Sequence, residues 1–452
     1  MAAVCLLSGM LAVAAAQEPS PAEPAVEAET LLPEAENPDS LQAMTNKYPQ
    51  IAEAVKKFEA RQFDEALALT EAAADAHPEL PPGETVMASL HFAARDLPGA
   101  IRMLDKAVQN HPGEPSAYLD LGNIAILQNR LTDATLLFEK TAEVLETFDD
   151  NADRKRKAAD RLLKGWASLA ERKEQWADAE THLSALAASE PDAADVQVRL
   201  ARAMFRNKKY KPAYEMMQAS AAVKEAGVSP ELAMAQFYSE MQDDESARKW
   251  IDYAIRQQPE NLQVRLGAVQ WHWQRGNAED VKKHVMKAVD IDPTSMPARM
   301  LYGMYAHYAG DLPTAATQFE AVLTRSPTDF AARNNLAMVL ADRAQADSLI
   351  RAKRMAEENL QAAGNNTVAA GTLGWAHYKL GQFEEAAKLM QAVAQAGGLN
   401  NRNNIYFMAR VADRAGQREQ AVELLKQVLD QPQLFEMRGA AEKWLQSIEP
   451  QD

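Results

Sequence analysis

The chain has 452 residues, of which 47% are hydrophobic and 25% are charged, and it contains only 19 Gly and 22 Pro. That composition is typical of a folded helical protein and excludes wholesale disorder. The formal net charge of -16 argues against a nucleic-acid partner, because affinity for a phosphate backbone comes mainly from clustered Lys and Arg.

Residues 1–16 form an uncharged apolar stretch that ends in Ala14-Ala15-Ala16. This stretch resembles the apolar core and small-residue cleavage site of a secretory signal peptide, although no basic segment precedes it. It is too short to span a bilayer, so we expect no integral membrane span there. The only cysteine, Cys5, lies inside it, and cleavage would leave a chain without thiols. The expectation is an exported, periplasmic protein with a cleaved signal peptide; the alternative is a cytoplasmic one.

Residues 17–46 are predicted to form an acidic linker rich in Pro, Glu and Ala. No Lys or Arg occurs between Gln17 and Ser40. A segment of this composition cannot bury a core. It would either space the folded part from whatever the N-terminus meets or serve as a solubilising tail.

A repeat with a period close to 34 residues begins at about residue 47 and continues to residue 432. Its clearest marker is a small residue, found at Ala66, Ala100, Ala134, Ala179, Ala213, Ala247, Val281, Ala315, Ala352, Ala386 and Ala421. Proline often follows the marker by twelve residues, where it would end a helix, and glycine often precedes it by five, where it suits a turn. These markers predict pairs of antiparallel helices that must stack, because neither helix can bury its apolar face alone.

Segments such as residues 310–315 (GDLPTA) and 372–386 (TLGWAHYKLGQFEEA) resemble tetratricopeptide (TPR) repeats. The helices over residues 331–394 are also similar to repeats of exported bacterial proteins in cell-envelope and exopolysaccharide systems. The resemblance implies an all-α fold, a right-handed α-solenoid of about eleven TPR helix pairs. A C-terminal capping helix and tail are expected over residues 433–452.

The repeat is interrupted at two places. Repeats 1–3 are expected over residues 47–146 and repeats 4–11 over residues 160–432, with a charged insertion over residues 147–159. This insertion would either lengthen a helix pair or hinge two sub-solenoids, and its basic run at residues 154–157 is interpreted as a solvated helix face. Three extra residues around 344–349 are expected to lengthen a turn.

No pattern for catalysis or cofactor binding is found in the sequence. The eight histidines occupy repeat positions, no pair has the i, i+4 spacing of a metallopeptidase helix, and no cysteine is placed to complete a zinc site. Gly-rich phosphate loops, nucleophile elbows and dinucleotide fingerprints are also missing from the sequence. We therefore expect no catalytic residue, no cofactor and no metal, and we predict that the chain is not an enzyme.

In TPR proteins, ligands usually lie on the concave surface made by the first helix of each pair. The resemblance therefore implies partner-binding positions in the late repeats, at Trp273, Met300, Met304, His307, Tyr308, Asn334, Met338, Trp375, Tyr378, Tyr406 and Arg410. Aromatic, Met and Arg side chains are enriched in binding hot spots. The same side chains could instead pack between helices, and both interpretations stay open. For Trp375, Tyr378 and Tyr308 the groove is favoured, because adjacent positions already supply core residues.

These patterns predict a non-catalytic protein–protein interaction scaffold that binds a partner protein or an extended peptide in the concave groove. The alternative is a glycan-contacting carrier or assembly factor in cell-envelope or exopolysaccharide export. In that alternative, Trp273, Trp375 and Tyr308 would contact the glycan.

Overall fold

The computed structural model describes residues 38–223, 229–364 and 366–448. The predicted signal peptide and most of the predicted acidic linker lie outside these residues. Within them the chain is helical and has no β-strand, and no helix is both long and apolar enough to cross a membrane. The all-α prediction is confirmed.

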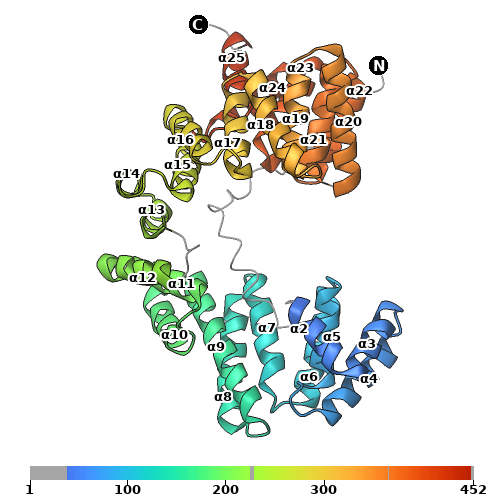
Figure 1. Ribbon diagram of the computed structural model, residues 1–452. Helices are drawn as coiled ribbons and strands as arrows, with labels where there is room; N and C mark the ends of the chain where they lie inside the picture. Colours follow the sequence, from blue (N-terminus) through green and yellow to red (C-terminus); the bar gives the residue numbers. More distant parts are fainter. Residues whose placement is uncertain (1–37, 224–228, 365, 449–452) are drawn as a thin grey trace. The chain divides into compact units, whose positions relative to one another are not determined.

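The described residues divide into two compact units (Figure 1), an N-terminal unit up to residue 247 and a C-terminal unit from residue 248 onward. The first helix is α2 (Pro38–Lys47). The helix pairs that follow are α3 (Pro49–Glu59) with α4 (Phe63–Ala76), α5 (Gly83–Ala93) with α6 (Leu97–Asn110), α7 (Pro115–Leu127) with α8 (Leu131–Thr147), α9 (Ala152–Arg172) with α10 (Trp176–Ser189), α11 (Ala194–Arg206) with α12 (Tyr210–Val223), and α13 (Pro230–Glu240) with α14 (Asp244–Gln257). The boundary between the two units falls within α14.

The helix pairs of the C-terminal unit are α15 (Leu262–Gln274) with α16 (Ala278–Ile291), α17 (Met296–Tyr308) with α18 (Leu312–Arg325), α19 (Phe330–Asp342) with α20 (Ala346–Ala363), α21 (Thr367–Lys379) with α22 (Phe383–Gln395), and α23 (Arg402–Arg414) with α24 (Arg418–Leu429). A short 3-10 turn, η2 (Gly398–Asn400), precedes α23, and α25 (Arg438–Ile448) follows the last pair. The described residues therefore form eleven helix pairs, as predicted.

The small marker residues explain why the pairs pack closely. All eleven lie in the second helix of a pair, and each has 0% of its surface exposed. The first helices use small residues in the same way. A Cβ atom at Gly122 or Gly165 would lie 2.3 or 2.6 Å from the buried ring of Phe138, so only glycine allows these helices to approach that ring.

The turn inside each pair relies on one residue with a positive φ angle. At Gly310 the φ angle is 80°, and the Gly310 and Asp311 N–H groups donate to the carbonyls of His307 and Ala306. This is the Schellman arrangement that ends a helix. Several earlier pairs place a non-glycine residue there, such as Arg61 with φ 60°. Glycine therefore marks only some of these turns.

Extra residues in the repeat lengthen helices. The first insertion extends α8 and α9 to 17 and 21 residues. The prediction that the second insertion lengthens a turn is wrong. The turn between α19 and α20, residues 343–345, is as long as the turn between α17 and α18, residues 309–311. The helix α20, in contrast, has 18 residues, whereas α18 has 14. An added helical turn keeps its backbone hydrogen bonds, so it needs no irregular loop.

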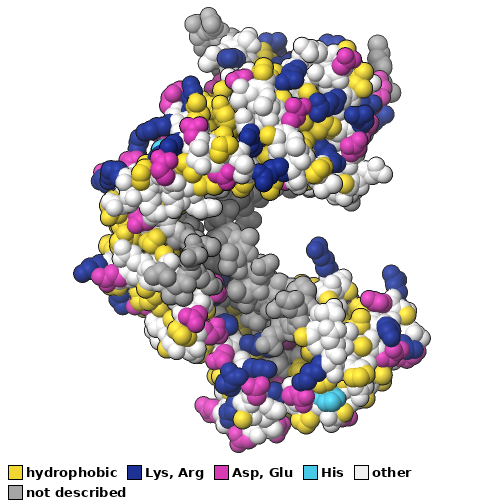
Figure 2. Space-filling view, viewed as in Figure 1, with side chains coloured by type: hydrophobic (Ala, Val, Ile, Leu, Met, Phe, Trp, Pro, Cys, Tyr) yellow, Lys and Arg dark blue, Asp and Glu magenta, His cyan; other side chains and the backbone are white. Residues whose placement is uncertain are grey.

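Charged side chains of both signs are interspersed over each unit on the face drawn in Figure 2. Three of the four residues of the basic run in α9 pair with nearby carboxylates. Lys155 pairs with Asp149, and Arg156 and Lys157 pair with Asp153. These exposed pairs stabilise the fold little, which agrees with a solvated helix face.

Candidate functional site

The eleven positions predicted for partner binding lie on five first helices of the C-terminal unit, α15, α17, α19, α21 and α23. We call these eleven residues the late-repeat row. The structure buries six of them, Trp273, His307, Asn334, Met338, Trp375 and Tyr406. The other five are half-buried, Met300, Met304, Tyr308, Tyr378 and Arg410. Binding by the row stays a prediction, and its members differ in what they can reach.

Asp342, at the end of α19, joins three neighbouring repeats of the row. Its carboxylate lies 2.8 Å from His307 Nε2 on α17 and accepts a hydrogen bond of 3.0 Å from Trp375 Nε1 on α21. Lys379 Nζ, also on α21, lies 3.4 Å from the carboxylate. One half-buried acidic group therefore links three first helices.

The charge state of Asp342 follows from these contacts. Burial by itself would raise the pKa of its carboxyl group. The hydrogen bond and charge of His307, the charge of Lys379 and the hydrogen bond of Trp375 outweigh burial, so the pKa lies below its ordinary value. Asp342 was not among the predicted site residues. It lies one period after Tyr308, but Glu59 and Glu240 end the first helices of their own pairs in the same way, so the residue type at this position does not mark the site.

Aromatic rings pack along α21 and α23. The Trp375 ring is stacked on Tyr378 and on Phe407, with centroids 5.3 and 4.8 Å away, and Tyr406 meets it edge-on at 5.7 Å. Burial raises the pKa of Tyr406 to about 12. Trp375 is only 3% exposed, so it packs between helices here, whereas Tyr378 keeps an accessible part.

Three polar atoms of the row are buried without a hydrogen-bond partner in the structure. They are His307 Nδ1, Asn334 Oδ1 and Arg410 Nε. A buried polar atom left without a partner costs about 1–3 kcal/mol.

The chain's own C-terminus contacts one end of the row. We call residues 431–448 the terminal segment. The Leu434 N–H donates to the Trp273 carbonyl at 2.9 Å, and the Leu434 side chain is 2% exposed and clusters with Val269, Trp273 and Tyr305. A hydrogen bond therefore ties the terminal segment to the first helix pair of this unit.

The other end of the row is covered by the same segment. The Arg410 guanidinium lies over the Trp444 ring at 4.4 Å, and Tyr406 meets that ring edge-on at 6.1 Å. Arg418 Nη2 also donates to the carbonyl of Ile448. The predicted C-terminal helix thus packs on the last pair and, in addition, on side chains expected to receive a partner.

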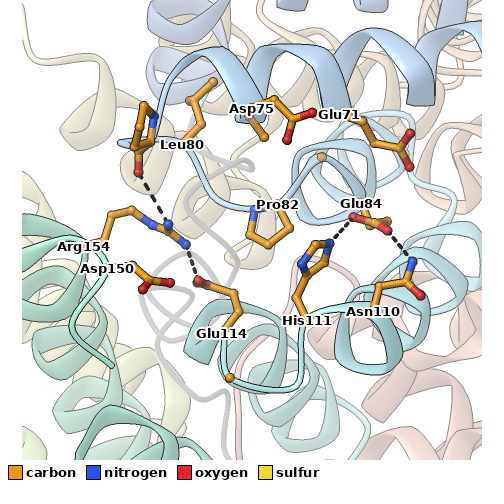
Figure 3. A pocket seen from close by; sticks show the side chains of 14 residues that line it. Glu71, Asp75, Leu80, Pro82, Glu84, Asn110, His111, Glu114, Asp150 and Arg154 are labelled. Carbon is orange, nitrogen blue, oxygen red and sulfur yellow. Dashed lines mark hydrogen bonds and ion pairs between the residues drawn. The ribbon is translucent and has the colours of Figure 1, made fainter. Parts of the chain in front are cut away.

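A separate cavity of about 680 Å³ lies in the N-terminal unit (Figure 3). Its wall is rich in carboxylates and includes Glu71, Asp75, Glu84, Glu114, Asp150, Asn110, His111 and Arg154. The Glu84 carboxylate accepts from Asn110 Nδ2 at 2.8 Å and lies 3.4 Å from His111 Nε2. Burial would raise the pKa of Glu84, but the Asn110 hydrogen bond leads the contacts that lower it overall.

The wall of this cavity is largely self-paired. Glu114 accepts hydrogen bonds from Arg154 and from Ser116 Oγ. Arg154 therefore departs from the solvated role predicted for its basic run, because its guanidinium ties the start of α9 to the start of α7. We assign no ligand to this cavity.

A polar cluster between α15 and α16 was not foreseen. His272, Asp280 and His284 place potential ligand atoms within 4.8 Å of one another. Arg265 Nη1 lies 3.1 Å from His284 Nδ1, and Arg248 Nη2 lies 3.5 Å from Asp280. Two guanidinium groups beside the cluster oppose a further cation, so we assign no metal to it. No spacing motif in the sequence marks the cluster, because its members come from two helices.

Burial, followed by the charges of His272 and Arg265, lowers the pKa of His284 to about 4. Burial also lowers the pKa of His272. Both imidazoles are therefore neutral near pH 7 and act as hydrogen-bonding groups in the core.

Comparison with known proteins adds the family. No curated protein matches the chain. Among solved structures, yeast Tom70 is 13% identical, with 90% of this chain and 95% of that chain covered and a TM-score of 0.35. PilW, a type IV pilus biogenesis factor, is 18% identical over 46% of this chain and 96% of its own, with a TM-score of 0.36. YrrB, described as a TPR protein with an unusual peptide-binding site, is 16% identical over 51% and 95%, with a TM-score of 0.32.

The sequence itself matches the family model of the tetratricopeptide repeat over residues 85–145, 164–222 and 303–358. Each matched stretch consists of the helix pairs described above. Together with the eleven buried markers that hold one repeat phase, these matches show that the chain contains tetratricopeptide repeats.

Proposed function

We propose that this protein is a non-catalytic scaffold that binds a partner protein or an extended peptide on the late-repeat row of its C-terminal unit. The observation that carries the proposal is that the row already holds a peptide segment. The terminal segment is bound through a backbone hydrogen bond, buried apolar side chains and a cation–π contact, which are the contacts by which one protein recognises another.

The half-buried members of the row support this proposal. Tyr378 lies beside Arg410, whose guanidinium is 5.8 Å from the centroid of the Tyr378 ring, and Met300 and Met304 pack at the edge of the same apolar cluster. Aromatic, Met and Arg side chains carry much of the binding energy at protein interfaces, and Met adapts to irregular surfaces. A partner can contact these four half-buried side chains, Tyr378, Arg410, Met300 and Met304, without unfolding a repeat.

A glycan partner has less support. Sugar rings stack on open aromatic faces, whereas the Trp375 ring is stacked on Tyr378 and on Phe407, and Trp273 is 8% exposed. The observations on the row therefore favour a protein or peptide.

The site is tested by photo-crosslinking from the full-length chain. A benzoylphenylalanine placed at Tyr378 should form an adduct with a protein in extracts of the native cells. The matched control is the same probe at Ile350, which lies on α20 and is 64% exposed. Adducts from Tyr378 and none from Ile350 support the proposal. Adducts from Ile350 alone, or from neither position, contradict it.

We also propose that the protein is exported, on the strength of the apolar stretch at residues 1–16. N-terminal sequencing of the protein purified from its native cells tests this proposal. A chain that begins at Gln17 supports export with cleavage, and a chain that keeps residues 1–16 in the cytoplasmic fraction contradicts it.

A further inference from the structure

We infer that the terminal segment is an internal competitor for the late-repeat row, and that the partner carries a segment of the same chemistry. That chemistry is a non-helical stretch with an apolar side chain two residues before a carboxylate, followed by a helix that presents a Trp. The inference rests on the proposed function and names the kind of partner and how its access is controlled.

Residues 433–437, which precede α25 and which we call the linking part of the terminal segment, contact specific polar groups of α23. Asn403 Nδ2 donates to Glu436 Oε2 at 2.8 Å, and Asn403 Oδ1 lies 3.4 Å from the backbone N–H of Met437. Arg402 Nη1 donates to Gln433 Oε1 at 2.6 Å. One Asn side chain therefore contacts both the backbone and a carboxylate of the segment, which fixes the position of the segment on α23.

The apolar anchors of the segment are unequally buried. Leu434, Phe435 and Met437 are 2%, 5% and 3% exposed, so the linking part is deeply buried. In α25, by contrast, only Ala441 is buried, and Trp444 is half-buried against Arg410. The helix α25 is thus held less tightly, and an incoming segment can replace it first and the linking part second.

Intramolecular competition lowers the apparent affinity of any partner for the row. A tethered segment acts at an effective concentration of about a millimolar, so a partner with the same contacts binds only the fraction of molecules in which the segment has left. A partner therefore needs more contacts than the segment makes, and the half-buried Tyr378 and Met300 lie where such contacts are available.

Gly276 allows the competition to be tested without changing the row. Its φ angle is 74°, and a Cβ atom there would lie 2.4 Å from the Pro432 carbonyl oxygen at the start of the terminal segment. Gly381 has almost the same φ angle, 77°, with nothing within 4 Å of its Cβ position. Gly276→Ala and Gly381→Ala therefore impose the same backbone strain, and only the first displaces the segment.

The experiment measures binding of a fluorescein-labelled synthetic peptide of residues 431–448 to the full-length chain by anisotropy. Gly276→Ala is expected to bind the peptide at least tenfold more tightly than the wild type, while Gly381→Ala matches the wild type. Leu434→Asp in the full-length chain should act like Gly276→Ala, because a carboxylate in the apolar pocket expels the segment. A peptide with the same Leu434→Asp change should not bind.

Each outcome decides the inference. Equal affinity of the wild type, Gly276→Ala and Leu434→Asp, with retained helical circular dichroism, would overturn it. Absence of peptide binding to every variant would also overturn it, yet the crosslink from Tyr378 could still support the proposed function. If Tyr378 forms no crosslink but the peptide binds tightly, the internal segment is the natural occupant of the late-repeat row. That result would contradict the proposed function and not the inference.

Discussion

Removing the Asp342 carboxylate is expected to destabilise the C-terminal unit by about 2–4 kcal/mol. In Asp342→Ala, the Trp375 indole N–H and the His307 ring nitrogen lose the acceptor that they share. Each stranded buried group costs about 1–3 kcal/mol. Lys379 adds little, because its side chain is 24% exposed and can turn to water.

The assay is thermal unfolding of the full-length chain followed by circular dichroism. A unit of this size loses about 2–4 °C of melting temperature per kcal/mol, so we expect a drop of roughly 5–15 °C in the transition of the C-terminal unit. Asp342→Asn should lower the melting temperature less than Asp342→Ala, because its amide oxygen still accepts one hydrogen bond. Because the pKa of Asp342 is lowered in the folded state, its contribution is present at neutral pH. The gap between the wild type and Asp342→Asn should therefore narrow once the pH falls below about 4.

A double-mutant cycle separates the free-energy cost of the stranded Trp375 N–H from the cost of general damage to the core. Trp375→Phe removes the indole N–H, so Asp342→Ala should cost about 1–2 kcal/mol less in that background than in the wild type. A melting temperature unchanged by Asp342→Ala, or a cycle with no coupling, would refute the role assigned to this carboxylate.

Three further predictions concern packing and protonation. Ala315→Leu should overpack a helix pair and lower the free energy of unfolding by about 1–3 kcal/mol in urea titrations, because Ala315 is fully buried; an unchanged midpoint would contradict the repeat phase. Gly122→Ala should lower the free energy of unfolding by a similar amount because its Cβ would meet the Phe138 ring, whereas Gly113→Ala, with open space at that position, should change it by less than about 0.5 kcal/mol. For His284 the folded pKa of about 4 lies below the ordinary value of about 6.5, so the unfolded chain takes up a proton first and stability falls by up to about 3 kcal/mol as the pH drops between these values. His284→Gln should lose less melting temperature between pH 7 and pH 4.5 than the wild type, and equal losses would argue against a buried neutral imidazole.

The sequence predicted which helix carries each residue of the site, but not whether its side chain is accessible to a partner. The repeat phase places Trp375 and Tyr378 on the same first helix, which the structure confirms. Their accessibility differs because Phe407 of the next repeat stacks on Trp375. What covers a first-helix side chain depends on the neighbouring repeat, and the phase of its own repeat contains no information about that neighbour.

The sequence by itself determined the family, the number of helix pairs and the buried position of every marker such as Ala66 and Ala421. It could do so because each pair is stabilised mainly by contacts within about two periods of the chain, and such local contacts leave a periodic pattern. Only the tertiary structure decided that Asp342 links three repeats and that Leu434 binds the carbonyl of Trp273. The repeat phase assigns each of these residues to a helix, but it does not record which side chains of neighbouring repeats meet or where the segment after the last pair packs.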